Sequence, residues 1–304
     1  MAFVQSPLNY TGGKAKLLPQ ILPLFPKRIN TFVDLFCGGC NVAINTSAQK
    51  YICNDINTEL IGLLSLMKSD SESCFKKSIK EIISKYELSD SDTFGYSFYN
   101  CNSAKGLGTY NKEKFLSLRE DFNKSKKTSK SHFYKLYVLI VYAFNNQIRF
   151  NSEGKFNLPV GKRDYNKKMQ EKVSLFLKKI HESDFSFLNQ SFKDFSIEKL
   201  PEKSFVYADP PYLITTASYN EKKGWTDDDE KSLLSFLDLL NEHGIKFALS
   251  NVLETDGKEN KILKNWLNER PKYKCNHLKF SYSNSNYHKK NTNKKTDEVL
   301  IINY

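Results

Sequence analysis

The chain has 304 residues, and its 46 Lys and Arg residues outnumber its 34 Asp and Glu residues, which gives a formal net charge of +12 at pH 7. This charge favours a polyanionic partner, nucleic acid first and an anionic membrane surface second, although a Lys-rich solvated surface would also explain it. The longest apolar run, residues 136–144, is far shorter than a membrane-spanning helix requires, and residues 1–10 lack the pattern of a signal peptide. We therefore expect a cytoplasmic protein without a membrane segment.

Six cysteines are scattered along the chain and form no recognisable disulfide pattern. Cys37 and Cys40 have the spacing of half a zinc site, but no second pair of Cys or His has a matching spacing. We expect reduced thiols that hold no metal, as is usual in the cytoplasm.

Both ends of the chain show the alternation of strands and helices that is typical of an α/β fold. Apolar runs that predict strands occur at residues 31–36, 51–55, 185–189, 205–209, 246–251 and 299–304. Apolar-periodic stretches that predict helices occur at residues 41–48, 57–67, 227–242 and 258–269. This alternation predicts a mostly parallel, doubly wound sheet.

The middle of the chain, residues 68–184, does not show this alternation. Amphipathic helical patterns occur there instead, for example at residues 74–86 and 132–144. A polar segment punctuated by glycine, residues 145–162, is typical of a hairpin. We predict that residues 68–184 form a mainly helical insertion between two parts of one domain, residues 1–67 and 185–304.

DLFCGG, residues 34–39, is a turn after a strand with two adjacent glycines. Glycine permits tight turning and lets a ligand approach the backbone at the carboxyl edge of a sheet. The dinucleotide-binding pattern G-x-G-x-x-G is not met, so an ordinary turn explains the segment about as well. Asp55 ends the next strand, where a carboxylate could accept both hydroxyls of a ribose or could simply cap a helix.

YTGGK, residues 10–14, lacks the first glycine and the hydroxyl residue of a phosphate-binding loop. Its glycines could still bring an aromatic ring and an ammonium group to an anionic ligand, or could form a plain surface turn. A second basic segment, residues 281–295, is suited either to contact phosphate or to be disordered.

The strongest local signal is FVYADPPY, residues 205–212, in which an apolar strand runs into an aspartate, two prolines and a tyrosine. The prolines fix the backbone φ angle and remove two amide protons. The residue before a proline is also kept from helical angles. Asp209 therefore begins a stiff loop of acceptors without competing donors, which suits a substrate with an NH₂ group, and Tyr212 offers a face for a flat ring. The simpler alternative is a proline-ended strand with a capping Asp.

FVYADPPY, DLFCGG and YTGGK, together with their order and spacing, resemble the D12 class of DNA adenine-N6 methyltransferases of the Dam type, which includes methylases that accompany restriction enzymes. The likeness spans nearly the whole chain and extends to YICNDIN, RFNSEGKFNLPVGK and KKTDEVLIINY. It implies a Rossmann-like class I methyltransferase with a mixed, seven-stranded type of sheet and a target-recognition insertion at residues 68–184. It also implies a monomer or weak dimer that uses no metal.

The resemblance implies an activity: transfer of a methyl group from S-adenosyl-L-methionine to N6 of a flipped adenine in a short double-stranded DNA sequence. The implied cofactor-binding residues are Tyr10, Lys14, Asp34, Phe36, Gly38, Asp55, Ser191, Phe192 and Asp209. The implied catalytic residues are Asp209, Pro210, Pro211 and Tyr212. If Asp209 and the Pro210 carbonyl each accept one N–H bond, the adenine nitrogen can present its lone pair for transfer.

The segment from Phe144 to Lys162 aligns with the part of the family that reads DNA. The implied DNA-binding residues are Phe144, Asn145, Gln147, Arg149, Asn151, Pro159 and Lys162. Phe144 and Asn145 correspond to residues that enter the base stack, and Arg149 to an arginine that reads guanine. The GATC methylases usually carry an aromatic-Asn-Gly-Leu pattern here, whereas this chain has FNNQ, so a CATG site or another ATG-containing site is a fair hypothesis.

Other readings of the sequence stay open. A related methyltransferase could act on RNA adenine or on cytosine N4, although Asp at the first position of DPPY and the long basic insertion favour DNA adenine. A DNA-binding homologue without activity would be expected to have lost the cofactor motifs, which are intact here. Pairing with a restriction endonuclease, the recognition sequence and the oligomeric state are not determined by the sequence.

Overall fold

The computed structural model describes residues 3–10, 12–215, 224–279 and 296–304. The basic segment at residues 281–295 and Thr11 of YTGGK lie outside these described residues. Within them, no helix is both long enough and apolar enough to cross a membrane.

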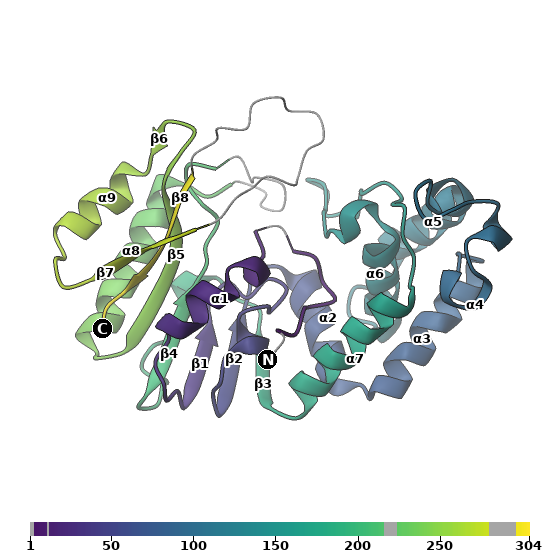
Figure 1. Cartoon of the computed structure of the whole chain (residues 1–304). Helices are drawn as coiled ribbons and strands as arrows, with labels where there is room; N and C mark the ends of the chain where they lie inside the picture. Colours follow the sequence, from purple (N-terminus) through teal and green to yellow (C-terminus); the bar gives the residue numbers. More distant parts are fainter. Residues whose placement is uncertain (1–2, 11, 216–223, 280–295) are drawn as a thin grey trace.

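The centre of the molecule is a mixed sheet with the strand order β3-β2-β1-β4-β5-β8-β7 (Figure 1). Its strands in the described residues are β1 (Thr31–Asp34), β2 (Lys50–Asn54), β3 (Asp184–Leu188), β4 (Ser204–Ala208), β5 (Lys246–Thr255), β7 (Lys274–Leu278) and β8 (Thr296–Ile302). The first five strands of this order run parallel, and β8 is antiparallel to both β5 and β7. The short strand β6 (Lys258–Glu259) pairs with β5. The predicted α/β class with a mixed, seven-stranded type of sheet is confirmed.

The helices of the described residues lie on both faces of the sheet and beside it. They are α1 (Leu18–Ile21), α2 (Thr58–Ser69), α3 (Glu72–Lys85), α4 (Ser91–Phe94), α5 (Gly108–Lys124), α6 (Lys130–Tyr142), α7 (Lys167–His181), α8 (Asp227–Glu242) and α9 (Lys261–Asn268). Short 3₁₀ helices include η1 (Lys14–Lys16), η3 (Ala43–Asn45), η5 (Phe144–Asn146) and η6 (Phe192–Asp194).

Alternating side chains of the parallel strands build a core on each face of the sheet. Phe32 and Phe205 lie in one apolar cluster, and the residues next to them, Val33 and Val206, lie in another. Successive strand residues point to opposite faces, so one strand contributes to both cores. The sheet is therefore packed on both faces, and the loops at the carboxyl ends of its strands begin from buried strand residues.

Three elements differ from those the sequence predicted. The helix predicted at residues 41–48 is only the 3₁₀ turn η3, because the chain leaves the glycine turn with Cys40 at a positive φ of 60° and Thr46 already extended. The helix predicted at 258–269 begins only at Lys261, after β6. Strand β7 was not predicted, because its residues KCNHL form a polar edge strand with little apolar periodicity.

The helices α3 to α6 form a helical body beside the β3 edge of the sheet, on the right in Figure 1. Helix α6 packs against α2, α3 and α5, while α7 packs against α2, α3 and β3 and so contacts both the helical body and the sheet. After α6 the chain forms a hairpin-like segment, closed by isolated bridges between Ala143 and Val160 and between Phe150 and Phe156.

Candidate active site

A pocket lies at the carboxyl ends of β1 and β4, where three predicted motifs come together. The two strands are parallel neighbours, so Asp34 at the end of β1 lies beside the strand that leads into Asp209. Six of the predicted cofactor residues line this pocket: Tyr10, Lys14, Asp34, Phe36, Gly38 and Asp209. This edge of a parallel sheet is where open α/β folds bind their ligands.

The glycines of YTGGK and DLFCGG let these two segments approach each other closely. Gly38 has a φ of +46°, and a Cβ atom there would lie 3.0 Å from Cδ1 of Tyr10. A Cβ at Gly39 would lie 2.8 Å from the carbonyl oxygen of Leu8. Larger residues at these positions would push the two loops apart, so the glycines are required by the shape of the pocket.

Asp34 is a buried carboxylate on the wall of this pocket. Its side chain is 2% exposed, and its Oδ1 atom has no hydrogen-bond partner in the described residues. Burial, more than any other influence, raises the pKa of the Asp34 carboxyl well above its usual range. A buried acceptor without a partner is costly, so this atom is a natural place for a ligand donor.

Asp55, at the end of β2, braces the glycine turn and does not line the pocket in this structure. Its Oδ2 accepts from the backbone N–H of Gly38 at 3.0 Å, and its Oδ1 accepts from that of Asn57 at 2.9 Å. Burial raises the pKa of Asp55 to about 6, although both amide bonds oppose that shift. Its implied contact with ribose hydroxyls stays a prediction.

A corner of charged and aromatic groups surrounds Asp209. The Nζ atom of Lys14, whose side chain is only 5% exposed, lies 2.8 Å from Asp209 Oδ1, 3.7 Å from Glu298 Oε1 and 4.9 Å from the centre of the Tyr212 ring. The Tyr212 hydroxyl lies 3.2 Å from Asp209 Oδ1 and 3.1 Å from Glu298 Oε1. Both polar contacts of the Asp209 carboxylate within the described residues therefore go to Oδ1 and none goes to Oδ2.

An aromatic cluster stands next to the pocket. The rings of Phe36, Phe192 and Trp225 lie within 5.8 Å of one another, centre to centre. The indole N–H of Trp225 donates to Glu230 at 2.6 Å, which fixes the orientation of its ring. Ser191 caps the turn at η6 by accepting from the backbone N–H of Lys193.

The family model for D12 class N6 adenine-specific DNA methyltransferases matches residues 10–296 of this chain. The chain belongs to this family. Similar curated proteins include the type II methyltransferase M.FokI of Planomicrobium okeanokoites, 42% identical over 100% of this chain and 43% of that protein. The modification methylase StsI of Streptococcus sanguinis is 40% identical over 99% of this chain and 43% of its own length. The DNA adenine methylase of Escherichia coli K12 is 27% identical over 97% of this chain and 94% of its own length.

The family predicted from the motifs is thus confirmed. The chain spans less than half the length of the first two relatives and nearly all of the length of the third. Methyltransferases of this class use S-adenosyl-L-methionine as the methyl donor.

The segment predicted to read DNA, residues 144–162, lies on the surface of the helical body. Phe144 is 53% exposed, and Asn145 and Asn146 after it both have a positive φ, which is uncommon for residues other than glycine. The carbonyl oxygen of Asn145 accepts from the side chain of Asn9, next to Tyr10, at 2.7 Å. The predicted DNA-contacting tip is therefore tied to the segment that leads into YTGGK.

Other predicted DNA-binding residues shape the hairpin in this structure. Arg149 donates from Nε to Asn157 Oδ1 at 2.8 Å and from Nη2 to the Asn157 carbonyl at 3.2 Å. Asn151 accepts from two backbone amides of its own turn. The backbone carbonyl of Pro159 accepts from the Phe144 N–H. Gln147 and Lys162 lie in the same segment, and all seven predicted contacts are thus gathered on one feature.

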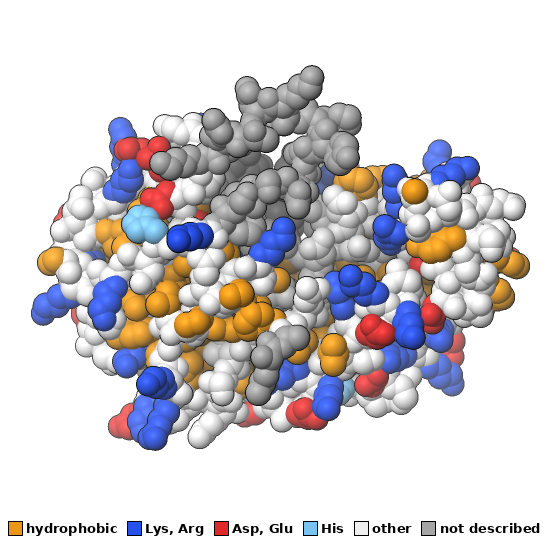
Figure 2. Space-filling view, in the orientation of Figure 1, with side chains coloured by type: hydrophobic (Ala, Val, Ile, Leu, Met, Phe, Trp, Pro, Cys, Tyr) orange, Lys and Arg blue, Asp and Glu red, His pale blue; other side chains and the backbone are white. Residues whose placement is uncertain are grey.

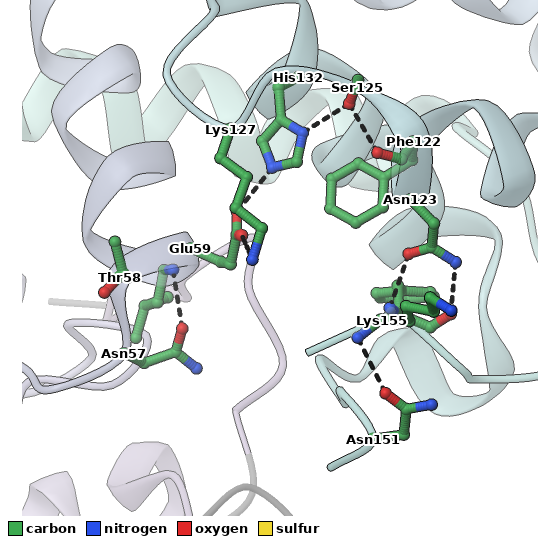
Figure 3. A network of polar contacts seen from close by, with 12 residues as sticks. Asn57, Thr58, Glu59, Phe122, Asn123, Ser125, Lys127, His132, Asn151 and Lys155 are labelled. Carbon is green, nitrogen blue, oxygen red and sulfur yellow. Dashed lines mark hydrogen bonds and ion pairs between the residues drawn. The ribbon is translucent and has the colours of Figure 1, made fainter. Parts of the chain in front are cut away.

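A polar network joins this segment and the helical body to the sheet domain (Figure 3). Glu59 of α2, two residues after the cap Asn57, contacts Nε2 of the buried His132 on α6 at 2.7 Å. On α5, Asn123 forms two bonds with the backbone of Phe156, which fastens the hairpin to that helix. The position of the hairpin relative to the pocket is therefore fixed by side-chain contacts as well as by apolar packing.

Two residues of the site were missed from the sequence. Glu298 lies in β8, one residue before the strand predicted at residues 299–304, and nothing in the local sequence indicates that this acid is buried. Trp225 follows the residues that the structure does not describe, and nothing in the local sequence joins it to Phe36. Only the fold brings β8 and the start of α8 to the pocket.

Proposed function

We propose that this chain transfers the methyl group of S-adenosyl-L-methionine to N6 of an adenine in a short double-stranded DNA sequence. The observation that carries the proposal is the corner at the end of β4, where Asp209 is held by Lys14 and Tyr212 beside the pocket. A carboxylate in a proline-stiffened loop, with one oxygen engaged and the other available, is suited to accept an N–H from an amino group.

The pocket fits the proposed cofactor in two respects. Asp34 Oδ1 is a buried acceptor without a partner among the described residues, and an ammonium group such as that of a methionyl end could donate to it. The absence of a Cβ atom at Gly38 lets the Tyr10 ring, which lines the pocket, pack closely against the glycine turn. We therefore assign Tyr10, Lys14 and Asp34 to the methionyl end, and Phe36, Ser191 and Phe192, with Trp225, to the adenine. When bound, the cofactor supplies a methyl group on a positively charged sulfur.

The chemistry required of the protein is to make a poor nucleophile available. The lone pair of the adenine amino group is delocalised into its ring, and two acceptors that each take one N–H favour a tetrahedral nitrogen. Asp209 Oδ2 and the Pro210 carbonyl are these acceptors, and Pro210 and Pro211 contribute no competing amide protons. The Tyr212 ring provides a stacking surface for the extruded base. Lys14 holds Asp209 Oδ1, so that the carboxylate is oriented before the base arrives.

Residues 68–184, with the hairpin at 145–162, are proposed to recognise DNA. The net charge is +12, and Figure 2 shows Lys and Arg side chains over both the sheet and the helical body on the side drawn there. These charges favour the phosphate backbone of DNA as a partner. Phe144, exposed at a turn with positive φ angles, is suited to enter the base stack beside the flipped adenine. Arg149 is proposed to read a guanine in the major groove.

We also propose that the chain modifies DNA in partnership with a restriction endonuclease. Two relatives at 40% identity or above are named as a type II methyltransferase and a modification methylase, which supports this role over simple host marking. An ATG-containing site, rather than GATC, stays the hypothesis for the recognition sequence because FNNQ replaces the usual pattern at residues 144–147.

The decisive experiment compares the wild-type protein with Asp209→Ala. We expect radiolabelled methyl transfer to duplex DNA by the wild type, its loss in the variant, and measurable DNA binding by both. Mapping N6-methyladenine in the DNA of cells that express the chain would give the recognition sequence. Near-normal turnover by Asp209→Ala, or preferential labelling of RNA by the wild type, would overturn the assignment.

A further inference from the structure

Glu298 is a buried acid at the point where strand β8 becomes apolar. Its side chain is 2% exposed, and the four residues that follow it in β8 are Val299, Leu300, Ile301 and Ile302, all buried. Burying a carboxylate is unfavourable unless charges and donors compensate it, and an apolar residue would serve sheet packing better. The acid therefore calls for an explanation beyond the stability of the strand.

Two contacts of Glu298 provide one, because they go to the two groups that also hold Asp209. Glu298 Oε1 lies 3.1 Å from the Tyr212 hydroxyl and 3.7 Å from Lys14 Nζ. The same hydroxyl lies 3.2 Å from Asp209 Oδ1, and the same ammonium 2.8 Å from it. The two carboxylates thus share two bridging donors in a closed arrangement.

The backbone at this point is irregular in a way that places the side chain. Strand β8 pairs with β5, and the register shifts between Val252, opposite Glu298, and Glu254, opposite Asp297. Such a β-bulge bends the strand locally and redirects side chains, and bulges of this kind are frequent next to active sites. The β-bulge therefore lies directly beside the Val252–Glu298 pair.

We propose that Glu298 is a positioning residue for methyl transfer, which holds Tyr212 and Lys14 so that Asp209 keeps an accepting oxygen directed at the amino group of the base. This inference rests on the proposed function. Without Glu298, the ammonium and the hydroxyl would both turn fully to Asp209. The carboxylate would then be a poorer acceptor, and the Tyr212 ring would lose the anchor that sets its angle.

Glu298 also affects the charge of Asp209. Burial raises the pKa of the Asp209 carboxyl, Lys14 lowers it, and the negative charge of Glu298 raises it. The titratable and charged groups that face Asp209 come from four elements and the DPPY loop, and they are Lys14, Asp34, Tyr207, Tyr212 and Glu298. Removing the charge at Glu298 should therefore keep Asp209 ionised to a lower pH.

The test is Glu298→Gln, which keeps the size and one acceptor oxygen but removes the charge. We expect the rate of single-turnover methyl transfer at neutral pH to fall by up to about 100-fold, because the acceptor is misplaced. The acidic limb of the pH–rate profile should nevertheless move to lower pH, which a merely structural role would not cause. The matched control is Asp297→Asn on the same strand, whose exposed carboxylate contacts only His277 among the described residues; it should change neither quantity.

A second variant keeps the proposal testable if Glu298→Gln proves unstable. Tyr212→Phe removes the shared hydroxyl but keeps the ring, and Glu298→Gln should cost less in that background than in the wild type. A wild-type rate and an unmoved acidic limb in Glu298→Gln, or fully additive effects in the double variant, would refute the role of Glu298. If the role of Glu298 were refuted while the wild type is active and Asp209→Ala is inactive, the proposed function would still hold. If the wild type transferred no methyl group, the proposed function itself would be overturned.

Discussion

The catalytic corner and the recognition hairpin are held in place by different physical means. At the corner, Lys14 and Glu298 are buried and joined to Asp209 through contacts between charged groups. In the hairpin, Arg149 and Asn151 are held by bonds to the backbone and side chains of neighbouring hairpin residues. The first arrangement spans three distant parts of the chain, whereas the second is largely local.

This difference matches what the two regions are proposed to do. A transfer site has to hold acceptors in one geometry with respect to reacting atoms, which favours buried, mutually constrained charges. A DNA-reading surface has to present side chains to solvent and exchange protein contacts for contacts with bases. Variants at the corner should therefore affect stability and pH dependence, while variants in the hairpin should affect discrimination between DNA sequences.

The largest effect is expected for Lys14→Met. Removing the ammonium leaves two carboxylates, Asp209 and Glu298, close together and without their cation, so the free energy of unfolding should fall by about 3–5 kcal/mol. The loss should be smaller below neutral pH, where one of the acids can take up a proton. Urea denaturation at two pH values measures both effects. Lys27→Met, at an exposed position outside the corner, is the control, and equal losses in the two variants would contradict a buried charge network.

A pH effect on stability is expected from Asp55. Because burial raises its pKa from 3.8 to about 6, the folded protein binds this proton more tightly than the unfolded chain does. Its contribution is therefore full below pH 4 and is lost as the pH rises to about 6, by roughly 3 kcal/mol in all. Asp34 and Asp209, whose pKa values burial also raises, should act in the same direction.

Asp55→Asn isolates the contribution of this residue. The variant should lose less stability than the wild type between pH 4 and 6 when both are unfolded by urea without cofactor. Parallel curves for the two proteins across that interval would show that Asp55 does not titrate there.

The sequence predicted the strands of the central sheet better than the contacts between distant segments. Residues 31–36, 51–55 and 205–209 read correctly as strands because continuous apolar runs are bounded by polar residues and turns. The glycine and proline motifs then placed Asp34 and Asp209 correctly at strand ends, and the structure shows that these two strands are neighbours. These signals are local, and local patterns suffice for elements whose two faces are both buried.

What the sequence did not yield depends on contacts between distant segments. Val42, Ala43 and Ile44 are buried, as a helix at 41–48 would require, but packing under the N-terminal segment buries them in a 3₁₀ turn instead. Glu298 precedes the strand predicted at residues 299–304, and its place in β8 is apparent only once that strand is paired with β5. Whether an acid is exposed or belongs to a charge network depends on how the sheet is assembled. The hydrophobic periodicity of the sequence does not reveal this.

In the hairpin, the expected effect of Arg149→Ala is on specificity. A guanidinium that reads guanine contributes about 1–3 kcal/mol of discrimination at one base pair. Here Asn157 already orients the Arg149 side chain through two bonds. Affinities for DNA sites changed at each position in turn should reveal one relaxed base pair. Arg149→Lys keeps the charge but not the planar fork, so it should show the same relaxation; weaker binding with unchanged preferences in Arg149→Ala would mark a phosphate contact instead.

The smallest effect is expected for Asn123→Ala, which removes the attachment of the hairpin to α5. Asn123 accepts from the Phe156 N–H at 2.9 Å and donates to the Phe156 carbonyl at 3.2 Å, so its loss leaves two groups of a buried residue unpaired. The free energy of unfolding should fall by about 1 kcal/mol. The hairpin carries the proposed base contacts and the pocket does not depend on Asn123, so DNA discrimination should weaken while calorimetry gives unchanged affinity for S-adenosyl-L-methionine. Asn151→Ala, which changes the turn of the hairpin and not its attachment to α5, is the variant with which Asn123→Ala is compared. A loss of cofactor affinity in Asn123→Ala would mean that the corner and the hairpin are not held independently.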